Sequence, residues 1–312
     1  MPDFGKLKYW WMKVPGLNGY ISERQAQERL AAHTDVLDVS SEFLLYSPNS
    51  SGGYRERSVL TKSCVNGLMP AFVAMATNAV ALVAEVMDID SVYHDEDAEQ
   101  RCKLLGRLLT EHGSDKATDH DYHKLYSSIL ADREDVRSIL EVGMGSNNLD
   151  VVSNMGAGGR PGASLRAFRD FLPNAQIYGA DIDKSILFQE DRIKTFPVDQ
   201  LKPEALSRLV ELIPDNYFDL VIDDGLHAPD ANVNTLSFAL GKVAPGGWIV
   251  VEDIRVESIS VWKLTSALLP RSFRSYIFLA KNGVMFAAQR CAPDEQFVSL
   301  TKNFRDGQLG LN

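Results

Sequence analysis

The second half of the chain alternates short apolar runs with segments in which apolar residues recur at helical spacing. Short apolar runs predict buried strands, and helical spacing predicts helices that cover them. Strands are expected at 138–143, 175–183, 195–200, 217–225 and 248–254, and helices at 162–172, 205–213, 232–243 and 260–269. Two last runs, 274–280 and 283–290, predict a terminal hairpin. The pattern indicates an α/β fold with a doubly wound, Rossmann-like parallel sheet that ends in a C-terminal antiparallel hairpin.

The first 135 residues show a less regular and mostly helical pattern. Helices are expected at 22–33, 68–87, 95–112 and 119–131, and turn chemistry marks 47–56. We therefore expect three parts, which are a mostly helical auxiliary or oligomerisation region (1–110), a main domain (111–295) and a tail (296–312).

One apolar stretch, 68–84, is barely long enough to cross a membrane. It contains Pro70, Thr77 and Asn78 and is rich in alanine. A helix buried in the core or at the interface of a homo-oligomer explains it better than a membrane span.

Composition narrows the class of protein. The chain has 312 residues and a formal net charge of −10, which disfavours nucleic-acid binding and favours a small-molecule partner. Its three cysteines, Cys64, Cys102 and Cys291, are far apart and form no CxxC pair, so we expect reduced thiols and no zinc site. The N-terminus lacks a secretory pattern, and we expect a cytoplasmic protein with no membrane contact.

A glycine-rich loop follows the first strand of the regular half. "ILEVGMGSNN" places Glu141, Gly143 and Gly145 at the carboxyl end of that strand, where glycines let a ligand approach the backbone. A tight turn without a ligand explains the same residues. If a ligand binds, the long loop before the next helix, which begins near Ser164, favours S-adenosylmethionine over a dinucleotide, whose pyrophosphate needs a tight turn into the helix. Glu141, Gly143, Gly145 and Ser164 are thus the first candidate cofactor residues.

Polar residues also end the next two strands. Asp181 ends the second strand, where a carboxylate can accept both ribose hydroxyls, and Asp183 is the fallback for that role. Asp199 and Gln200 end the third strand and are candidates for contacts with the adenine edge.

Acidic residues gather at the ends of two strands that we expect to be neighbours. Asp223 and Asp224 end one of them, and Glu252 and Asp253 end the other. Unpaired carboxylates at one edge would repel one another, and a hard divalent cation such as Mg²⁺ would offset that repulsion. His227 follows Asp224 by three residues and is expected to face the same pocket.

Several of these segments resemble the macrocin and mycinamicin sugar O-methyltransferase family. "LEVGMG", "GASLRAFRDFLPNAQIYGADIDKS", "VDQ", "FDLVIDDGLH" and "PGGWIVVEDI" carry the resemblance, which covers roughly residues 110–255. It implies a class I methyltransferase sheet, S-adenosylmethionine and Mg²⁺ as cofactors, a sugar-containing small-molecule acceptor and an oligomeric assembly. The segment "HGSDK" (112–116) is similar to one that closes over the cofactor in this family.

The resemblance also assigns roles to residues. Asp224, Glu252 and Asp253 match the family's magnesium ligands, and His227 matches its general base. A hydroxyl next to a second hydroxyl would bind the cation, and His227 would accept its proton. Asp223, counted with the cofactor pocket, or Asp230 would orient the imidazole.

Other functions remain open from the sequence. A catechol-type O-methyltransferase, a dinucleotide-dependent oxidoreductase and a non-catalytic scaffold are the alternatives. His120 and His123, in "DHDYH", either line the substrate entrance or begin a solvated helix.

Overall fold

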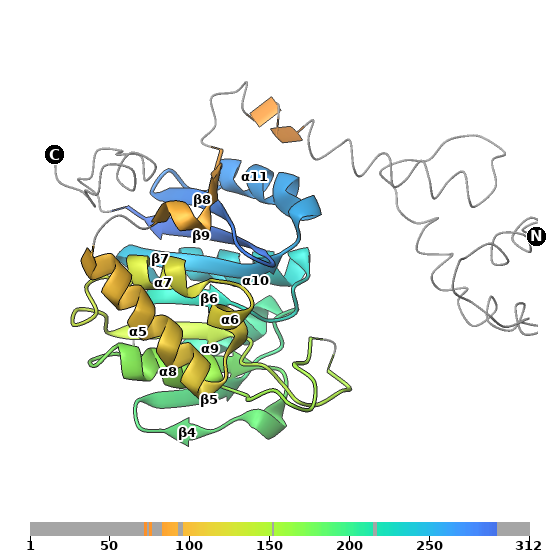
Figure 1. Ribbon diagram of the computed structural model, residues 1–312. Helices are drawn as coiled ribbons and strands as arrows, with labels where there is room; N and C mark the ends of the chain where they lie inside the picture. The colour runs from red at the N-terminus through yellow and green to blue at the C-terminus, as the bar shows by residue number, and fades with distance from the viewer. Residues whose placement is uncertain are drawn as a thin grey trace, which may run out of the picture. The chain divides into compact units, whose positions relative to one another are not determined.

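The architecture is described from a computed structural model (Figure 1). The chain divides into two compact units, Met1–Asn78 and Ala79–Asn312. The structure describes residues 72–73, 75–76, 83–92, 96–151, 153–214 and 217–291. The expected helix at 22–33, the turn at 47–56, Cys64 and the tail at 296–312 lie outside these residues, and the oligomerisation role of the N-terminal region stays a prediction.

A nine-stranded sheet forms the centre of the second unit, in the order β1-β8-β9-β7-β6-β2-β3-β5-β4. Its parallel middle consists of β2 (Ser138–Val142), β3 (Gln176–Asp181), β5 (Ile193–Pro197), β6 (Phe218–Asp223) and β7 (Val243–Ile254). The antiparallel hairpin β8 (Phe273–Leu279) and β9 (Val284–Arg290) joins β7, and the short β4 (Gln189–Glu190) pairs with β5. The expected α/β sheet with a terminal hairpin is confirmed.

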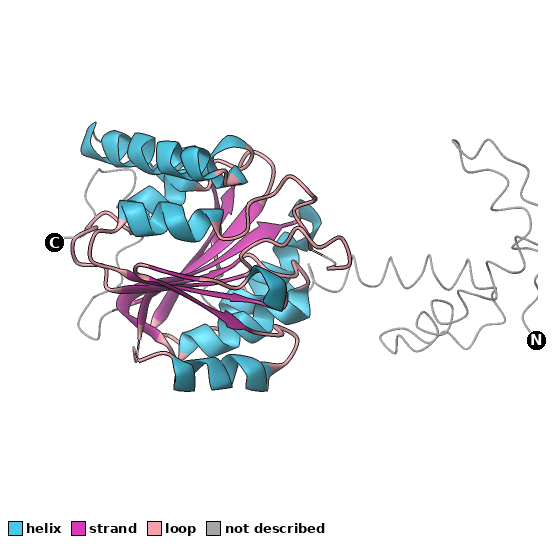
Figure 2. Cartoon of the chain, turned by 90° about the horizontal axis from the view of Figure 1, so that it is seen from below, coloured by secondary structure: helices cyan, strands magenta, loops and turns pink. Residues whose placement is uncertain are grey.

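Helices cover both faces of this sheet (Figure 2). One face packs against α5 (Glu96–His112), α7 (His123–Ile129) and α8 (Ala163–Phe171), and the short α6 (Asp115–Thr118) links α5 to α7. The other face packs against α9 (Pro203–Leu212), α10 (Pro229–Leu240) and α11 (Ile259–Ala267). Short 3₁₀ turns complete the described elements: η2 (Ile89–Val92), η3 (Lys184–Ile186) and η4 (Val256–Ser258).

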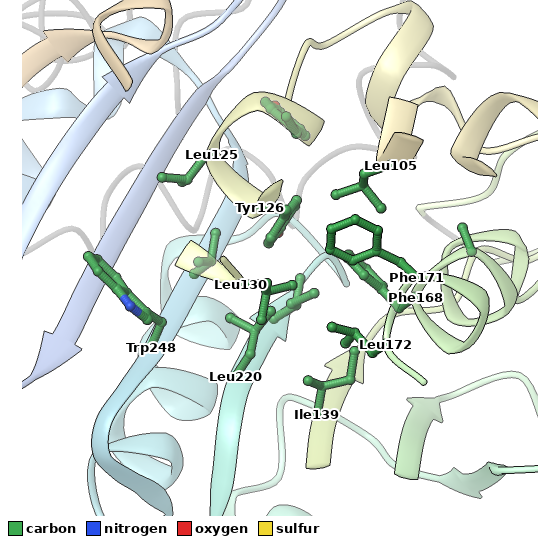
Figure 3. Packing of buried hydrophobic residues seen from close by; sticks show 14 of the residues in the cluster. Leu105, Leu125, Tyr126, Leu130, Ile139, Phe168, Phe171, Leu172, Leu220 and Trp248 are labelled. Atoms are coloured by element: carbon green, nitrogen blue, oxygen red, sulfur yellow. The ribbon is translucent and has the colours of Figure 1, made fainter. Parts of the chain in front are cut away.

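The central strands are apolar on both sides because each face of the sheet has its own core. In β2, Ile139 belongs to the cluster under α5, α7 and α8, whereas its neighbour Leu140 belongs to the cluster under α9, α10 and α11. Figure 3 shows the first cluster, in which Phe168 and Phe171 of α8 lie close to Leu105 of α5. Burial on both faces is the reason these strands read as continuous apolar runs.

The structure corrects the expectation of one helix over residues 68–87. Its last residues form a strand, β1 (Glu85–Asp88), which is the edge strand of the sheet and pairs in parallel with β8. Backbone pairing with β8 explains the outcome, since the segment has no apolar pattern of its own. In the described part of the chain, no helix is long and apolar enough to span a membrane.

The unit that contains the sheet begins earlier than the boundary expected at residue 110. It starts at Ala79 and includes α5, which buries Leu105 and Leu109 completely in the core beside α8. This helix therefore belongs to the sheet domain, and it leads directly into α6, which supplies a residue of the site.

Candidate active site

The predicted acidic residues lie at one edge of the sheet, where β2, β6 and β7 end. Val142 of β2 pairs with Asp223 of β6, which in turn pairs with Val251 of β7. Glu141, Asp224 and Glu252 follow or flank these positions and therefore meet at the same edge. The prediction that acids from separate strands converge is confirmed by this register.

Gly143 allows the loop after β2 to cross the loop after β6. Its φ is 91°, and a Cβ atom at this position would overlap the backbone carbonyl of Asp224. Its N–H donates to the carbonyl of Ala180 at 2.8 Å, which holds the loop against β3. Gly145 has a φ of 76° and packs against Met155. Close packing alone therefore requires glycine at 143, whether or not a ligand binds.

A buried lysine, Lys116 of α6, lies at the centre of the acidic cluster. Its Nζ is 2.5 Å from Asp224 Oδ2 and 3.2 Å from Glu141 Oε1, and it also donates to Glu252 Oε2. Burial alone would lower the pKa of Lys116, but the charges of Asp224, Glu252 and Glu141 outweigh it and hold that pKa well above 10.5. The ammonium group therefore stays charged and neutralises part of the cluster. Sequence reasoning singled out the segment around Lys116 but missed this role.

Glu141 and Glu252 are both inaccessible to solvent and are held by hydroxyl groups as well. Glu141 Oε2 accepts from Ser164 Oγ at 2.5 Å, so two of the expected cofactor residues bond to each other. Glu252 Oε1 accepts from the hydroxyl of Tyr126 in α7. Burial raises the pKa of both carboxyl groups, and Lys116 opposes that rise. These acids form an inner layer around Lys116.

An outer, partly exposed layer consists of Asp224, His227 and Asp253. His227 Nε2 lies 3.7 Å from Asp253 Oδ2 and 4.0 Å from Asp224 Oδ1. One ligand atom from each residue lies within 4.8 Å of the others. The structure thus gathers Asp224 and Asp253 as predicted, with His227 as the third member, whereas the oxygens of Glu252 contact Lys116 and Tyr126.

This outer layer fits a divalent cation. Carboxylate oxygens from the loop after β6 and from the last residues of β7 lie close together, and oxygen ligands suit Mg²⁺. The side chains of Asp224, His227 and Asp253 are about 25–31% exposed, so a cation and a second ligand can reach them.

The acids at the carboxyl end of β3 hold the glycine loop. Asp181 Oδ2 accepts from the N–H of Met144 and its Oδ1 from the N–H of Asp183, both at 2.9 Å. Asp183 Oδ2 accepts from Ser146 Oγ at 2.5 Å. Burial raises the pKa of Asp181, and these backbone hydrogen bonds oppose the rise. Asp181 therefore lies at the expected strand end, beside Gly143 and its loop.

Gln200 and Asp223 form a buried pair. Gln200 Nε2 donates to Asp223 Oδ1 at 2.6 Å and to Thr235 Oγ1 at 2.8 Å, and its Oε1 accepts from the N–H of Leu226. Asp223 is fully buried, and burial raises its pKa. These contacts brace the loop that carries His227.

Both described contacts of His227 involve Nε2, which lies near the carboxylates of Asp253 and Asp224. The expected role of Asp223 or Asp230 at the other ring nitrogen stays a prediction. Asp199, the other residue expected at the adenine edge, lies at the surface and pairs with Lys202 at 2.6 Å.

Comparison with known proteins gives matches of sequence and of structure, although no family model matches the chain. Over 152 residues the chain is 33% identical to the 8-demethyl-8-alpha-L-rhamnosyl tetracenomycin-C 2'-O-methyltransferase of Streptomyces olivaceus, which covers 48% of this chain and 38% of that protein. Over 94 residues it is 44% identical to the mycinamicin VI 2''-O-methyltransferase of Micromonospora griseorubida, which covers 30% of this chain and 23% of that protein. The match thus spans well under two thirds of these relatives.

A solved structure agrees with the sequence matches. The MycE methyltransferase of the mycinamycin biosynthetic pathway, in complex with Mg, SAH and mycinamycin VI, superposes with a TM-score of 0.50 and 26% identity. The superposition covers 62% of this chain and 55% of that one. The described unit therefore has the fold of the class I methyltransferases, and its sequence is similar to that of the sugar O-methyltransferases named above.

Proposed function

We propose that this chain transfers the methyl group of S-adenosylmethionine to a hydroxyl group of a sugar-containing small molecule, in a reaction that depends on Mg²⁺. The observation that carries the proposal is the outer layer of Asp224, His227 and Asp253, which combines ligands for a cation with a base at the carboxyl ends of β6 and β7. The sugar O-methyltransferases among the relatives, and the Mg and SAH in the MycE complex, support the same reading.

The cofactor would lie at the carboxyl ends of β2 and β3. Gly143 and Gly145 keep the backbone there free of side chains, and Asp181 has lone pairs left to accept ribose hydroxyls after its two backbone bonds. Gln200 and Asp223 would contribute indirectly, because they are buried and hold the loop that carries His227.

Asp224 and Asp253 would hold the cation from two separate segments, the loop after β6 and the last residues of β7. Bound there, Mg²⁺ supplies Lewis acidity, which makes a sugar hydroxyl easier to deprotonate. Lys116 takes one oxygen of Asp224 and leaves the other, Oδ1, on the side of His227. The lysine thereby fixes which oxygen of Asp224 faces the acceptor.

His227 would accept the proton of the acceptor hydroxyl through Nε2. That nitrogen lies 4.0 Å from Asp224 Oδ1 and 3.7 Å from Asp253 Oδ2, so it is close to a hydroxyl held by the cation at these residues. The deprotonated oxygen then attacks the methyl carbon, the carbon–sulfur bond breaks, and S-adenosylhomocysteine leaves. Fixed positions of both reactants supply much of the rate.

The test is methyl transfer from labelled S-adenosylmethionine to deoxysugar glycosides and, in parallel, to catechols. We expect transfer to the glycoside, loss of turnover in EDTA, and recovery when Mg²⁺ is added back. His227→Ala should lower kcat by about 100-fold or more, since general-base catalysis contributes that much, and leave the affinity for S-adenosylhomocysteine unchanged. Full activity in EDTA would exclude the metal-dependent mechanism, and transfer to catechols alone would exclude the sugar acceptor.

A further inference from the structure

Asp253 has an unusual backbone conformation for a residue with a side chain. Its φ is 54°, in the left-handed region, and the pairing of β7 with β9 shifts register between Val251 and Ile254. Such a bulge turns a side chain away from the direction that regular pairing would give it. A conformation of this kind persists only where surrounding contacts hold it.

The hydroxyl of Tyr122 contacts Asp253 twice. It donates to Asp253 Oδ1 at 2.6 Å and accepts from the backbone N–H of Asp253 at 3.3 Å. Tyr122 is only 1% exposed, so its ring is fixed by the core. One buried hydroxyl therefore holds both the backbone and the carboxylate of the same strained residue, and leaves Oδ2 facing His227.

The turn of the β8–β9 hairpin leaves room for this hydroxyl. A Cβ atom at Gly283 would overlap the hydroxyl oxygen of Tyr122 and lie 3.5 Å from Asp253 Oδ1. The same turn is tied to the loop before Tyr122, because Asn282 Nδ2 donates to the carbonyl of Asp119 at 2.7 Å. The hairpin and the α6–α7 loop thus enclose the contact between Tyr122 and Asp253.

We propose that Tyr122 is a positioning residue that directs the Asp253 carboxylate toward the cation, and that glycine at position 283 leaves the space that the Tyr122 hydroxyl requires. This inference rests on the proposed function, because it takes Asp253 as a ligand. His120 stacks on Tyr122 with ring centroids 4.9 Å apart, and its Nδ1 lies 3.8 Å from Asp253 Oδ1, so it supports the same arrangement.

The test uses Tyr122→Phe, which removes the hydroxyl and keeps the buried ring. Mn²⁺ binding, followed by electron paramagnetic resonance, should weaken about 10-fold or more, as loss of a group that orients a metal ligand generally does. The affinity for S-adenosylhomocysteine should not change. Tyr217→Phe is the matched control, since Tyr217 is an exposed tyrosine of the same domain and should leave Mn²⁺ binding unchanged.

A second pair of variants tests the space at Gly283. Gly283→Ala should weaken Mn²⁺ binding as Tyr122→Phe does, whereas Gly158→Ala, where a Cβ atom meets nothing within 4 Å, should not. In the metal-free protein, the backbone N–H of Asp253 should exchange with solvent faster in Tyr122→Phe than in wild type, because it loses its acceptor. This readout does not depend on bound metal or on activity.

Asp253→Asn tests the proposed metal ligand separately from the residue that positions it. If Asp253→Asn weakens Mn²⁺ binding and Tyr122→Phe does not, or if exchange at Asp253 is unchanged, the positioning role is overturned while the proposed function stands. If Asp253→Asn itself leaves Mn²⁺ binding intact, Asp253 is not a ligand. Both the positioning role and the metal part of the proposed function are then overturned.

Discussion

Replacing Lys116 by methionine tests the inner layer of the site directly. The side chain of Lys116 is 3% exposed, and its ammonium group contacts three carboxylates, of which the side chains of Glu141 and Glu252 are at most 1% exposed. Methionine keeps a chain of similar length and removes the charge. Breaking a buried ion pair by removing one partner costs about 3–5 kcal/mol, because the charge left behind has no compensation. For a domain of this size that corresponds to a fall in Tm of roughly 6 to 20 °C.

The pH dependence of this loss has a definite sign. The pKa of Lys116 is raised, so its stabilising effect is present at neutral pH and disappears only as the pH rises above its ordinary value of 10.5. The pKa of Glu252 is already raised by burial, and Lys116 lowers it. Without the lysine, that pKa rises further, the folded protein retains a proton, and stability falls as the pH rises through it. The deficit of the variant should therefore be larger at pH 8 than at pH 5.5.

The assay is thermal and urea unfolding in EDTA at both pH values, which removes any stabilisation by bound cations. Lys103→Met is the control, because the ion pair between Lys103 and Glu99, one turn away, is exposed, and its loss should leave the unfolding midpoint unchanged. A Lys116→Met protein within about 1 kcal/mol of wild type would refute the reasoning, given that a lost buried pair costs several times more. If the loss of stability in Lys116→Met does not vary with pH, Glu252 is not the carboxyl group whose charge is left without compensation.

Two further predictions concern the frame of the site. Gly143→Ala should destabilise the protein by more than about 2 kcal/mol and reduce turnover, because the new Cβ would meet the carbonyl of Asp224 and the φ of 91° is strained for alanine. Unfolding curves and methyl-transfer rates that match wild type would contradict this prediction. Phe168→Ala should cost about 3–5 kcal/mol in urea unfolding, since the ring is fully buried between α8 and the sheet, and the affinity of the folded variant for S-adenosylhomocysteine should stay close to that of wild type.

Much of the fold was predictable because its signals are local. The strands β2 and β6 are buried on both faces, and their continuous apolar runs followed by glycine or acid predicted both the strands and their carboxyl ends. The segment at 85–88 gave no such signal. Its strand depends on an edge supplied by β8, almost two hundred residues later in the chain, so a helix was expected there.

The candidate site divides in the same way. The chain order of the strands predicted that Asp224 and Asp253 approach each other, because parallel neighbours end at one edge of the sheet. The partners of these acids were not predictable. Lys116 is 108 residues from Asp224 and 136 from Glu252, and Tyr122 is 131 residues from Asp253. Nothing in the local sequence marks them as buried or as paired with acids.

The sequence by itself determined the alternation of strands and helices, the sheet edge at which the acids gather, and the kind of chemistry that such residues support. Only the tertiary structure decided which oxygens face the opening. Lys116 and Tyr126 turn Glu252 inward, whereas Tyr122 and a left-handed backbone turn Asp253 outward toward His227. The physical reason is that hydrophobic periodicity reports burial one element at a time, while the direction of a carboxylate depends on donors brought to it by distant elements.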